Sequence, residues 1–208
     1  MGKISISHGN SKMGDIPSVS LPAWTTCREC ACWKKCYAKK LERIRKSVRE
    51  AYQRNLEVLQ NDPASYWQEV EAVIKVSRFF RFHVSGDIPS MEYLKKMVKL
   101  ADDNPHCEIL CFTKKYELVN EYIAPWAERL LPLEEILPSN LHLIFSGWKG
   151  LEMVNPYGLP EAHVIYRDGT TTAREDAHPC GGNCTECATT DSGCWVLKYG
   201  EQVVFHEH

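Results

Sequence analysis

Apolar residues recur every three or four positions between Lys39 and Gln60, which predicts a single amphipathic helix over this stretch. The opposite face of that helix is rich in Lys and Arg. Asp62 followed by Pro63 is typical of a helix start, with Asp62 as the N-cap, and a second helix is expected to run to about Ser77. This part of the chain is therefore expected to be helical.

After this helical part, apolar residues recur at every second position. In the segment Phe80-Arg81-Phe82-His83-Val84-Ser85 they alternate with polar residues, as in a strand with one polar face. Further strands are expected at residues 108–113, 141–146 and 163–166, with helices at residues 89–103 and 115–131. This strand-then-helix rhythm is typical of a mainly parallel sheet. We therefore expect an α/β fold with a partial, barrel-like (β/α) sheet.

A change in composition at Ala177 divides the chain. Residues 1–176 are expected to form the α/β partial-barrel domain, and residues 177–208 a cysteine-rich, metal-bound tail. A hairpin of residues 196–198 and 202–205 around Tyr199-Gly200 is expected to end the tail.

Ten cysteines in 208 residues are the feature of the composition that changes this picture most. The segment Met1–His8 has neither the apolar core nor the cleavage site of a secretory signal, so a cytoplasmic protein is expected. In a reducing cytosol, clustered cysteines are more often metal ligands than disulfides. No apolar run reaches the roughly 18 residues of a membrane span, and a net charge of −2 gives no overall preference for nucleic acid.

Four cysteines, Cys27, Cys30, Cys32 and Cys36, lie within ten residues. The set Cys27-x4-Cys32-x3-Cys36 would leave one iron of a [4Fe–4S] cluster open to a small molecule, with Cys30 as an alternative or fourth ligand. A closed zinc or iron–sulfur site with a structural role explains the same spacing equally well. The residues alone leave both interpretations open.

A second set of four, Cys180-x3-Cys184-x2-Cys187 and Cys194, lies in the tail. Four ligands favour a closed site, either an auxiliary iron–sulfur cluster or a structural zinc, and Gly181-Gly182 allow the backbone to fold tightly around an ion. Core packing is the preferred interpretation of the remaining Cys107 and Cys111.

Chemically active residues follow three of the predicted strands, in Ser85-Gly86-Asp87, Thr113-Lys114-Lys115 and Ser146-Gly147-Trp148-Lys149. Ligands of α/β proteins bind at the carboxyl ends of strands, so these segments are expected to surround one pocket. Arg81 and His83, on the polar strand face, and Lys114 are the candidate catalytic residues, with a structural histidine as the alternative for His83.

The basic face of residues Lys39–Arg54 could follow the phosphates of a nucleic acid, with Trp24, Trp33 and Tyr37 available to stack on bases. A solvated helix face is the commoner reason for such a run of charges. Nucleic acid is therefore a candidate partner, beside an unidentified small-molecule or macromolecular substrate.

Several motifs together resemble the phage gene product 88 domain family over nearly the whole chain. They are residues 10–22 (Asn-Ser-Lys-Met-Gly-Asp-Ile-Pro-Ser-Val-Ser-Leu-Pro), Thr26-Cys27, Cys32-x3-Cys36-Tyr37-Ala38, residues 80–87, Phe112-Thr113-Lys114, Cys184-x2-Cys187 and Cys194-Trp195. This resemblance implies a phage protein and brings no mechanism with it.

More distantly, a cysteine loop ending in Cys36-Tyr37-Ala38 and followed by α/β repeats resembles radical S-adenosylmethionine enzymes, which use a partial parallel barrel. The resemblance implies that Cys27, Cys32 and Cys36 bind a [4Fe–4S] cluster. It also implies that Ser85, Gly86 and Asp87 contact S-adenosylmethionine, with the Asp87 carboxylate at the methionyl ammonium. In such enzymes one electron splits the cofactor and yields a 5′-deoxyadenosyl radical that takes hydrogen from a substrate.

The sequence therefore predicts an iron–sulfur protein that acts as a radical-type enzyme with S-adenosylmethionine at an open cluster. The alternative is a non-catalytic module, stapled by zinc or iron–sulfur sites, that binds nucleic acid or a phage or host protein.

Overall fold

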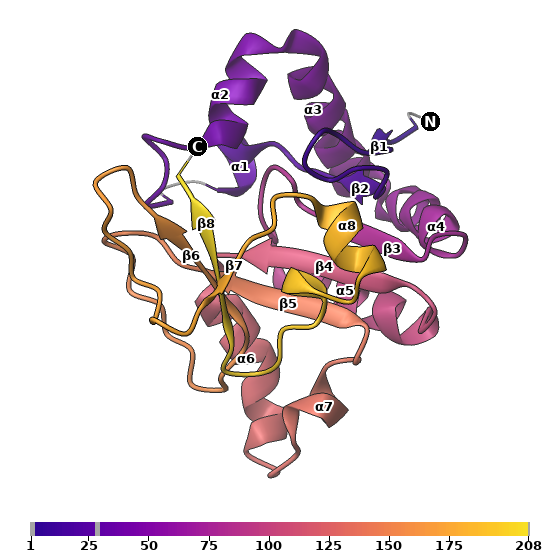
Figure 1. Cartoon of the computed structure of the whole chain (residues 1–208). Helices are drawn as coiled ribbons and strands as arrows, with labels where there is room; N and C mark the ends of the chain where they lie inside the picture. The colour runs from indigo at the N-terminus through magenta and orange to yellow at the C-terminus, as the bar shows by residue number, and fades with distance from the viewer. Residues whose placement is uncertain (1–2, 28–29, 208) are drawn as a thin grey trace.

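The computed structural model describes residues 3–27 and 30–207. At its centre lies one sheet, which is mostly parallel and remains open (Figure 1). Its strands are β1 (Ile6–Ser7), β2 (Ser18–Val19), β3 (Phe79–Phe82), β4 (Glu108–Thr113), β5 (Leu141–Ser146), β6 (Glu161–Ile165), β7 (His178–Pro179) and β8 (Gln202–His206).

The strand order is β1-β2-β3-β4-β5-β6-β8-β7, and among these pairs β1–β2 alone is antiparallel. Six strands, β2 to β6 and then β8, thus lie side by side in chain order and point the same way. The expectation of a mainly parallel α/β sheet is confirmed, although the sheet does not close. In this arrangement the carboxyl ends of the central strands share one edge.

Helices connect most of the strands. They are α1 (Ala23–Thr26), α2 (Tyr37–Ile44), α3 (Lys46–Asn61), α4 (Pro63–Ile74), α5 (Met91–Asp103), α6 (Tyr116–Ala127), α7 (Leu133–Ile136) and α8 (Cys184–Thr189), with a 3₁₀ turn η1 at Gly193–Trp195. The start of α4 is as predicted, because the Asp62 side chain accepts a hydrogen bond from the Ser65 N–H. Within the described residues, no helix combines the length and the apolar character needed to cross a membrane.

The single helix predicted for residues 39–60 is wrong, because the chain breaks at Arg45 between α2 and α3. Arg45 is extended, with φ −117° and ψ 98°. The two helices bury different faces. Glu42 of α2 accepts from the Ala23 N–H at the start of α1, whereas Asn55 of α3 donates to the carbonyls of Ser5 and Ser20 beside the sheet. One straight helix could not make both sets of contacts, and a spacing pattern does not reveal this.

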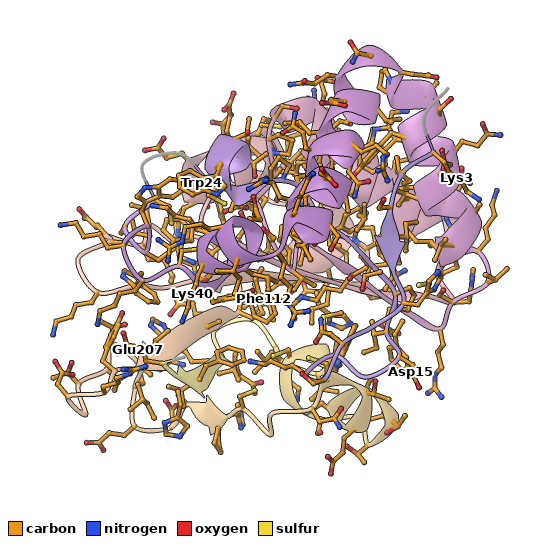
Figure 2. All side chains as sticks on the ribbon, turned by 90° about the horizontal axis from the view of Figure 1, so that it is seen from above. Lys3, Asp15, Trp24, Lys40, Phe112 and Glu207 are labelled. Carbon is orange, nitrogen blue, oxygen red and sulfur yellow. The ribbon has the colours of Figure 1, made fainter. Side chains whose placement is uncertain are left out.

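The two faces of the sheet pack against different layers. Along β4, Ile109 and Cys111 belong to the large core shared with α3 to α6, whereas Leu110 and Phe112 face a smaller cluster formed with the tail. Figure 2 shows Phe112 between the helical layer and the tail. Both Cys107 and Cys111 are buried in the large core, as predicted.

The predicted terminal hairpin is wrong. Residues 196–198 form no strand, and β8 pairs in parallel with β6 and with β7. Residues 177–208 therefore add two strands to the main sheet, and α8 and η1 cover one face of it (Figure 1). The tail is held there by bonds to the N-terminal segment, where the Cys184 N–H donates to the Lys12 carbonyl and the Thr185 hydroxyl to the Met13 carbonyl.

Candidate metal and cofactor site

A cavity of about 700 Å³ opens at the carboxyl ends of β3, β4 and β5. The three strand-end segments predicted to share a pocket all reach it, through Ser85, Gly86, Asp87, Thr113, Lys114, Ser146 and Trp148. The same cavity is lined by all eight clustered cysteines, those of the N-terminal loop and those of the tail. The sequence did not predict that the two sets face each other, because their meeting depends on how the tail folds back over the sheet.

The N-terminal cysteines lie on a chain of tight turns between α1 and α2. The Cys30 N–H donates to the Cys27 carbonyl, the Trp33 N–H to that of Cys30, and the Lys35 N–H to that of Cys32. Cys36 precedes the first residue of α2. These turns bring the four thiols to the cavity, and the Sγ atoms of Cys30 and Cys32 are 3.1 Å apart.

The four thiols differ in acidity. Hydrogen bonds from the Cys32 thiol lower the pKa of Cys30 and of Cys36 to about 6, and Cys32, as the donor, has a raised pKa. Burial and the charge of Asp87 raise the pKa of Cys27 to about 12. Because the Cys32 thiol has a single hydrogen, it favours the thiolate form that metals bind at Cys30 or at Cys36, one at a time.

Ser85-Gly86-Asp87 is fixed against the end of β2 and against α1. Gly86 has φ +83°, and a Cβ there would lie 2.5 Å from the Leu21 carbonyl oxygen and 2.8 Å from Thr26 Oγ1. Only glycine fits this close approach. The Asp87 N–H donates to Thr26 Oγ1 at 3.0 Å, so the residue directly before Cys27 also positions Asp87.

Asp87 itself is buried at the cavity wall. Its carboxylate accepts hydrogen bonds from the Thr113 hydroxyl (2.6 Å), the Lys114 N–H (2.9 Å) and the Ile88 N–H (2.8 Å). Burial raises the pKa of Asp87, and these three hydrogen bonds oppose the rise. The result is a fixed acceptor beside Cys27 that can receive a cationic group.

Glu42 is a site residue that the sequence analysis missed. It is fully buried, and its Oε1 accepts hydrogen bonds from the Ala23 N–H at 2.9 Å and from the Ser85 hydroxyl at 2.7 Å. Its Oε2 is buried without a hydrogen-bond partner in the part of the chain that is described. Glu42 thus ties the start of α1 to the segment after β3. It lies within a run of basic residues, where nothing marks it as buried.

Lys114 and Arg81 are two of the cations that line the cavity. Lys114 Nζ donates to Ser146 Oγ at 2.9 Å; burial lowers its pKa, but the charges of Cys32, Cys30 and Asp87 outweigh this and raise it overall. Arg81 lies over the Phe112 ring, 5.0 Å from its centroid, and faces the tail. Burial raises the pKa of Cys184 and of Cys194, and the charge of Arg81 opposes that rise. Each cysteine set therefore has a positive charge beside it.

His83 does not share a strand face with Arg81. Strand β3 ends at Phe82, and His83 has φ +60°, so its ring packs against Tyr93 of α5 with 5.4 Å between the ring centroids. Neither ring nitrogen has a hydrogen-bond partner of ordinary geometry among the described residues. Burial, helped by the charge of Arg81, lowers the pKa of His83 to about 3. His83 still lines the cavity, as a neutral ring.

We expect this buried ring to make the folded protein sensitive to acid. An unfolded histidine binds a proton near pH 6.5, whereas the folded one does not until about pH 3, so stability falls as the pH drops below about 6.5. When the pH is lowered from 7 to 5, the free energy of unfolding of the metal-free wild type should fall by about 2 kcal/mol relative to that of His83→Asn. Asn is chosen because it tolerates the positive φ. Urea unfolding of both proteins at the two pH values measures this, and parallel pH dependences would contradict it.

The tail cysteines also converge. Asn183 caps α8 by accepting from the Glu186 N–H, the Gly182 N–H points at Cys180 Sγ at 3.4 Å, and η1 brings Cys194 to the others. A Cβ on Gly193 would lie 3.1 Å from Cys187 Sγ. Burial raises the pKa of Cys194 to about 12, and the charges of Cys180, Cys184 and Cys187 add to the rise.

The thiols are unbonded to one another, since all ten cysteines are free. Within residues 3–27 and 30–207, no group of three or more His, Cys, Asp or Glu side chains is arranged to hold a metal ion as it stands. A metal would have to draw the thiols together, as it does in many cysteine-rich segments that order on binding. The type and number of donors fit such a site.

Comparison with known proteins places the chain among phage proteins. A model of the family described as Gene product 88 matches residues 4–188. The Gene 88 protein of Mycobacterium phage L5 is 30% identical over 121 residues, and that of Mycobacterium phage D29 is 28% identical over 121 residues. Each alignment covers 51% of this chain, and it covers 51% and 50% of the two relatives.

The chain thus spans about half the length of the curated relatives that it matches. No solved structure matches it. Because the family model covers most of the chain, including the N-terminal cysteine loop, the strand-end segments and three of the tail cysteines, the chain belongs to the Gene product 88 family.

Proposed function

We propose that this protein is a radical-type enzyme that binds an iron–sulfur cluster and S-adenosylmethionine. The observation that carries the proposal is the convergence on one cavity of the N-terminal thiols and of Asp87 after β3, at the carboxyl ends of parallel strands. Six parallel strands in chain order, with a cysteine loop after the first of them, agree with this proposal.

Cys27, Cys32 and Cys36 would hold the cluster, with Cys30 as an alternative or fourth ligand. When bound, the cluster supplies one electron from an external donor to the sulfonium of S-adenosylmethionine, which breaks a C–S bond and starts radical chemistry on a substrate. Lys114 lies close enough to Cys30 and Cys32 to offset the negative charge of bound thiolates.

Ser85, Gly86 and Asp87 would hold the methionyl end of S-adenosylmethionine. The absence of a side chain at Gly86 keeps the backbone close to Thr26, and Glu42 fixes the Ser85 hydroxyl. Asp87 would accept a hydrogen bond from the methionyl ammonium. Arg81, His83 and Lys114 line the cavity as candidate groups that contact the substrate.

The tail set Cys180, Cys184, Cys187 and Cys194 would hold a second centre, either an auxiliary cluster or a zinc. Four thiolates around one centre carry net negative charge, and the Arg81 guanidinium that faces Cys184 and Cys194 would reduce the cost of burying it. This centre would close the side of the cavity opposite the N-terminal loop.

Metal analysis of protein purified without oxygen tests the proposal. We expect a brown protein that contains iron, has broad visible absorbance and, once reduced, cleaves S-adenosylmethionine to 5′-deoxyadenosine and methionine. A colourless protein containing only zinc would overturn the proposal. That result would favour the non-catalytic, metal-stapled binding module instead.

A further inference from the structure

A second hollow, of about 450 Å³, lies beside the cysteine loop. We define it as the Trp24 groove, whose walls are Trp24, Trp33, Lys34, Lys35, Cys36, Lys39, Lys40, Arg43, Arg167 and Glu207. Trp24, Lys40 and Glu207 lie toward the same edge of the molecule, away from Lys3 and Asp15 (Figure 2). The groove thus joins the N-terminal loop and α2 to the C-terminal end of β8.

Positive charge is concentrated in this groove, although the whole chain carries a net charge of −2. Its described walls hold six Lys or Arg and one carboxylate. That carboxylate, Glu207, is already engaged by Lys35 Nζ at 2.7 Å and by the Arg167 N–H at 3.0 Å. Among the described residues, the side chains of Lys40, Arg43 and Arg167 make no ion pair. The groove is therefore suited to a polyanion.

Two indole rings lie among these charges. Trp24 and Trp33 meet edge to face, with 5.0 Å between their centroids, and Trp24 is 43% exposed. Lys39 Nζ stands 4.6 Å from the Trp24 ring and 3.9 Å from the Trp33 ring. Exposed aromatic faces beside a row of cations are typical of proteins that stack unpaired bases while they follow the phosphates.

The Trp24 groove adjoins the cavity. Trp33, Lys35, Cys36 and Glu207 line both. A strand lying in the groove would therefore present a nucleotide at the mouth of the cavity, as enzymes do when they act on an unpaired base.

We propose that the Trp24 groove binds single-stranded nucleic acid, and that nucleic acid is the class of substrate presented to the cavity. The second half of this inference rests on the proposed function; the first half does not. The sequence placed the basic surface along residues 39–54 as a whole. The break at Arg45 divides it, because the basic residues of α2 line the groove and those of α3 do not.

Fluorescence anisotropy with a labelled single-stranded RNA of about 12 nucleotides tests binding. The groove variant is Lys40→Glu with Arg43→Glu. Its matched control is Lys46→Glu with Arg49→Glu, an equal charge change at exposed positions of α3. We expect the groove variant to bind at least tenfold more weakly than wild type and to lower the slope of log affinity against log salt by about 2, with little change in the control.

Trp24→Ala tests the stacking contribution and should weaken binding about tenfold, whereas Trp24→Phe should restore most of it. Circular dichroism confirms that each variant is folded. Equal losses in the groove and control variants would overturn the inference. So would an absence of binding by wild type, or equal binding of duplex RNA or polyglutamate.

Iron is measured on the same preparations. Binding of single-stranded RNA by protein that contains only zinc would support the groove and contradict the radical enzyme. Iron-containing protein that cleaves S-adenosylmethionine but binds no RNA would support the radical enzyme and contradict the groove as a nucleic-acid site.

Discussion

Cys36→Ala is expected to lose the four irons of one [4Fe–4S] cluster, together with the matching part of the visible absorbance. Three thiolates are needed to hold a cluster that keeps one iron open, and the low pKa of Cys36, about 6, favours the thiolate form in which it binds. Iron and protein are quantified after anaerobic reconstitution of wild type and variant.

Cys107→Ala is the matched control. Cys107 is buried in the core on the helical side of the sheet and does not line the cavity. The control should retain the iron of the wild type. Equal iron loss in the two variants would overturn the assignment of Cys36, and thermal unfolding of each variant identifies any loss that results from misfolding.

Asp87→Asn is expected to weaken the binding of S-adenosylmethionine about 10- to 150-fold and to leave iron content unchanged. The substitution keeps the size of the side chain but removes the negative charge that would pair with the methionyl ammonium, and a hydrogen bond to a charged group contributes about 1.5–3 kcal/mol. Isothermal titration of the anaerobic, iron-loaded protein measures the affinity.

The buried network around Asp87 must survive for this result to be interpreted. The amide oxygen of Asn can still accept from the Thr113 hydroxyl and the Ile88 N–H, whereas its NH2 group faces the Lys114 N–H and cannot accept from it, so a loss of stability is expected. Unaltered affinity would remove Asp87 from the cofactor site.

Local patterns were sufficient for much of the fold. The strand-then-helix rhythm predicts β4 at Glu108–Thr113 and β5 at Leu141–Ser146 with the bounds that the structure has. Asp62 and Pro63 likewise define the start of α4. In these segments the local preference and the tertiary contacts agree.

Other segments depend on contacts between distant residues. His83 turns away from its strand face because its ring packs on α5, and β8 pairs with β6 instead of forming a hairpin with its neighbour. The candidate site was also predicted only in part. Their positions at strand ends predicted that Ser85-Gly86-Asp87 and Lys114 share a cavity. The position of the tail and the role of Glu42 became visible only in the structure.

Because the tail forms one wall of the cavity, the order of synthesis has a consequence for the site. The first cysteine loop leaves the ribosome well before Cys194, by roughly ten to thirty seconds at ordinary elongation rates. During that interval its four thiols have no covering wall and are open to oxidants and to competing metals. If the loop holds the proposed cluster, its insertion is therefore best timed before the last strand docks, while the loop is still accessible.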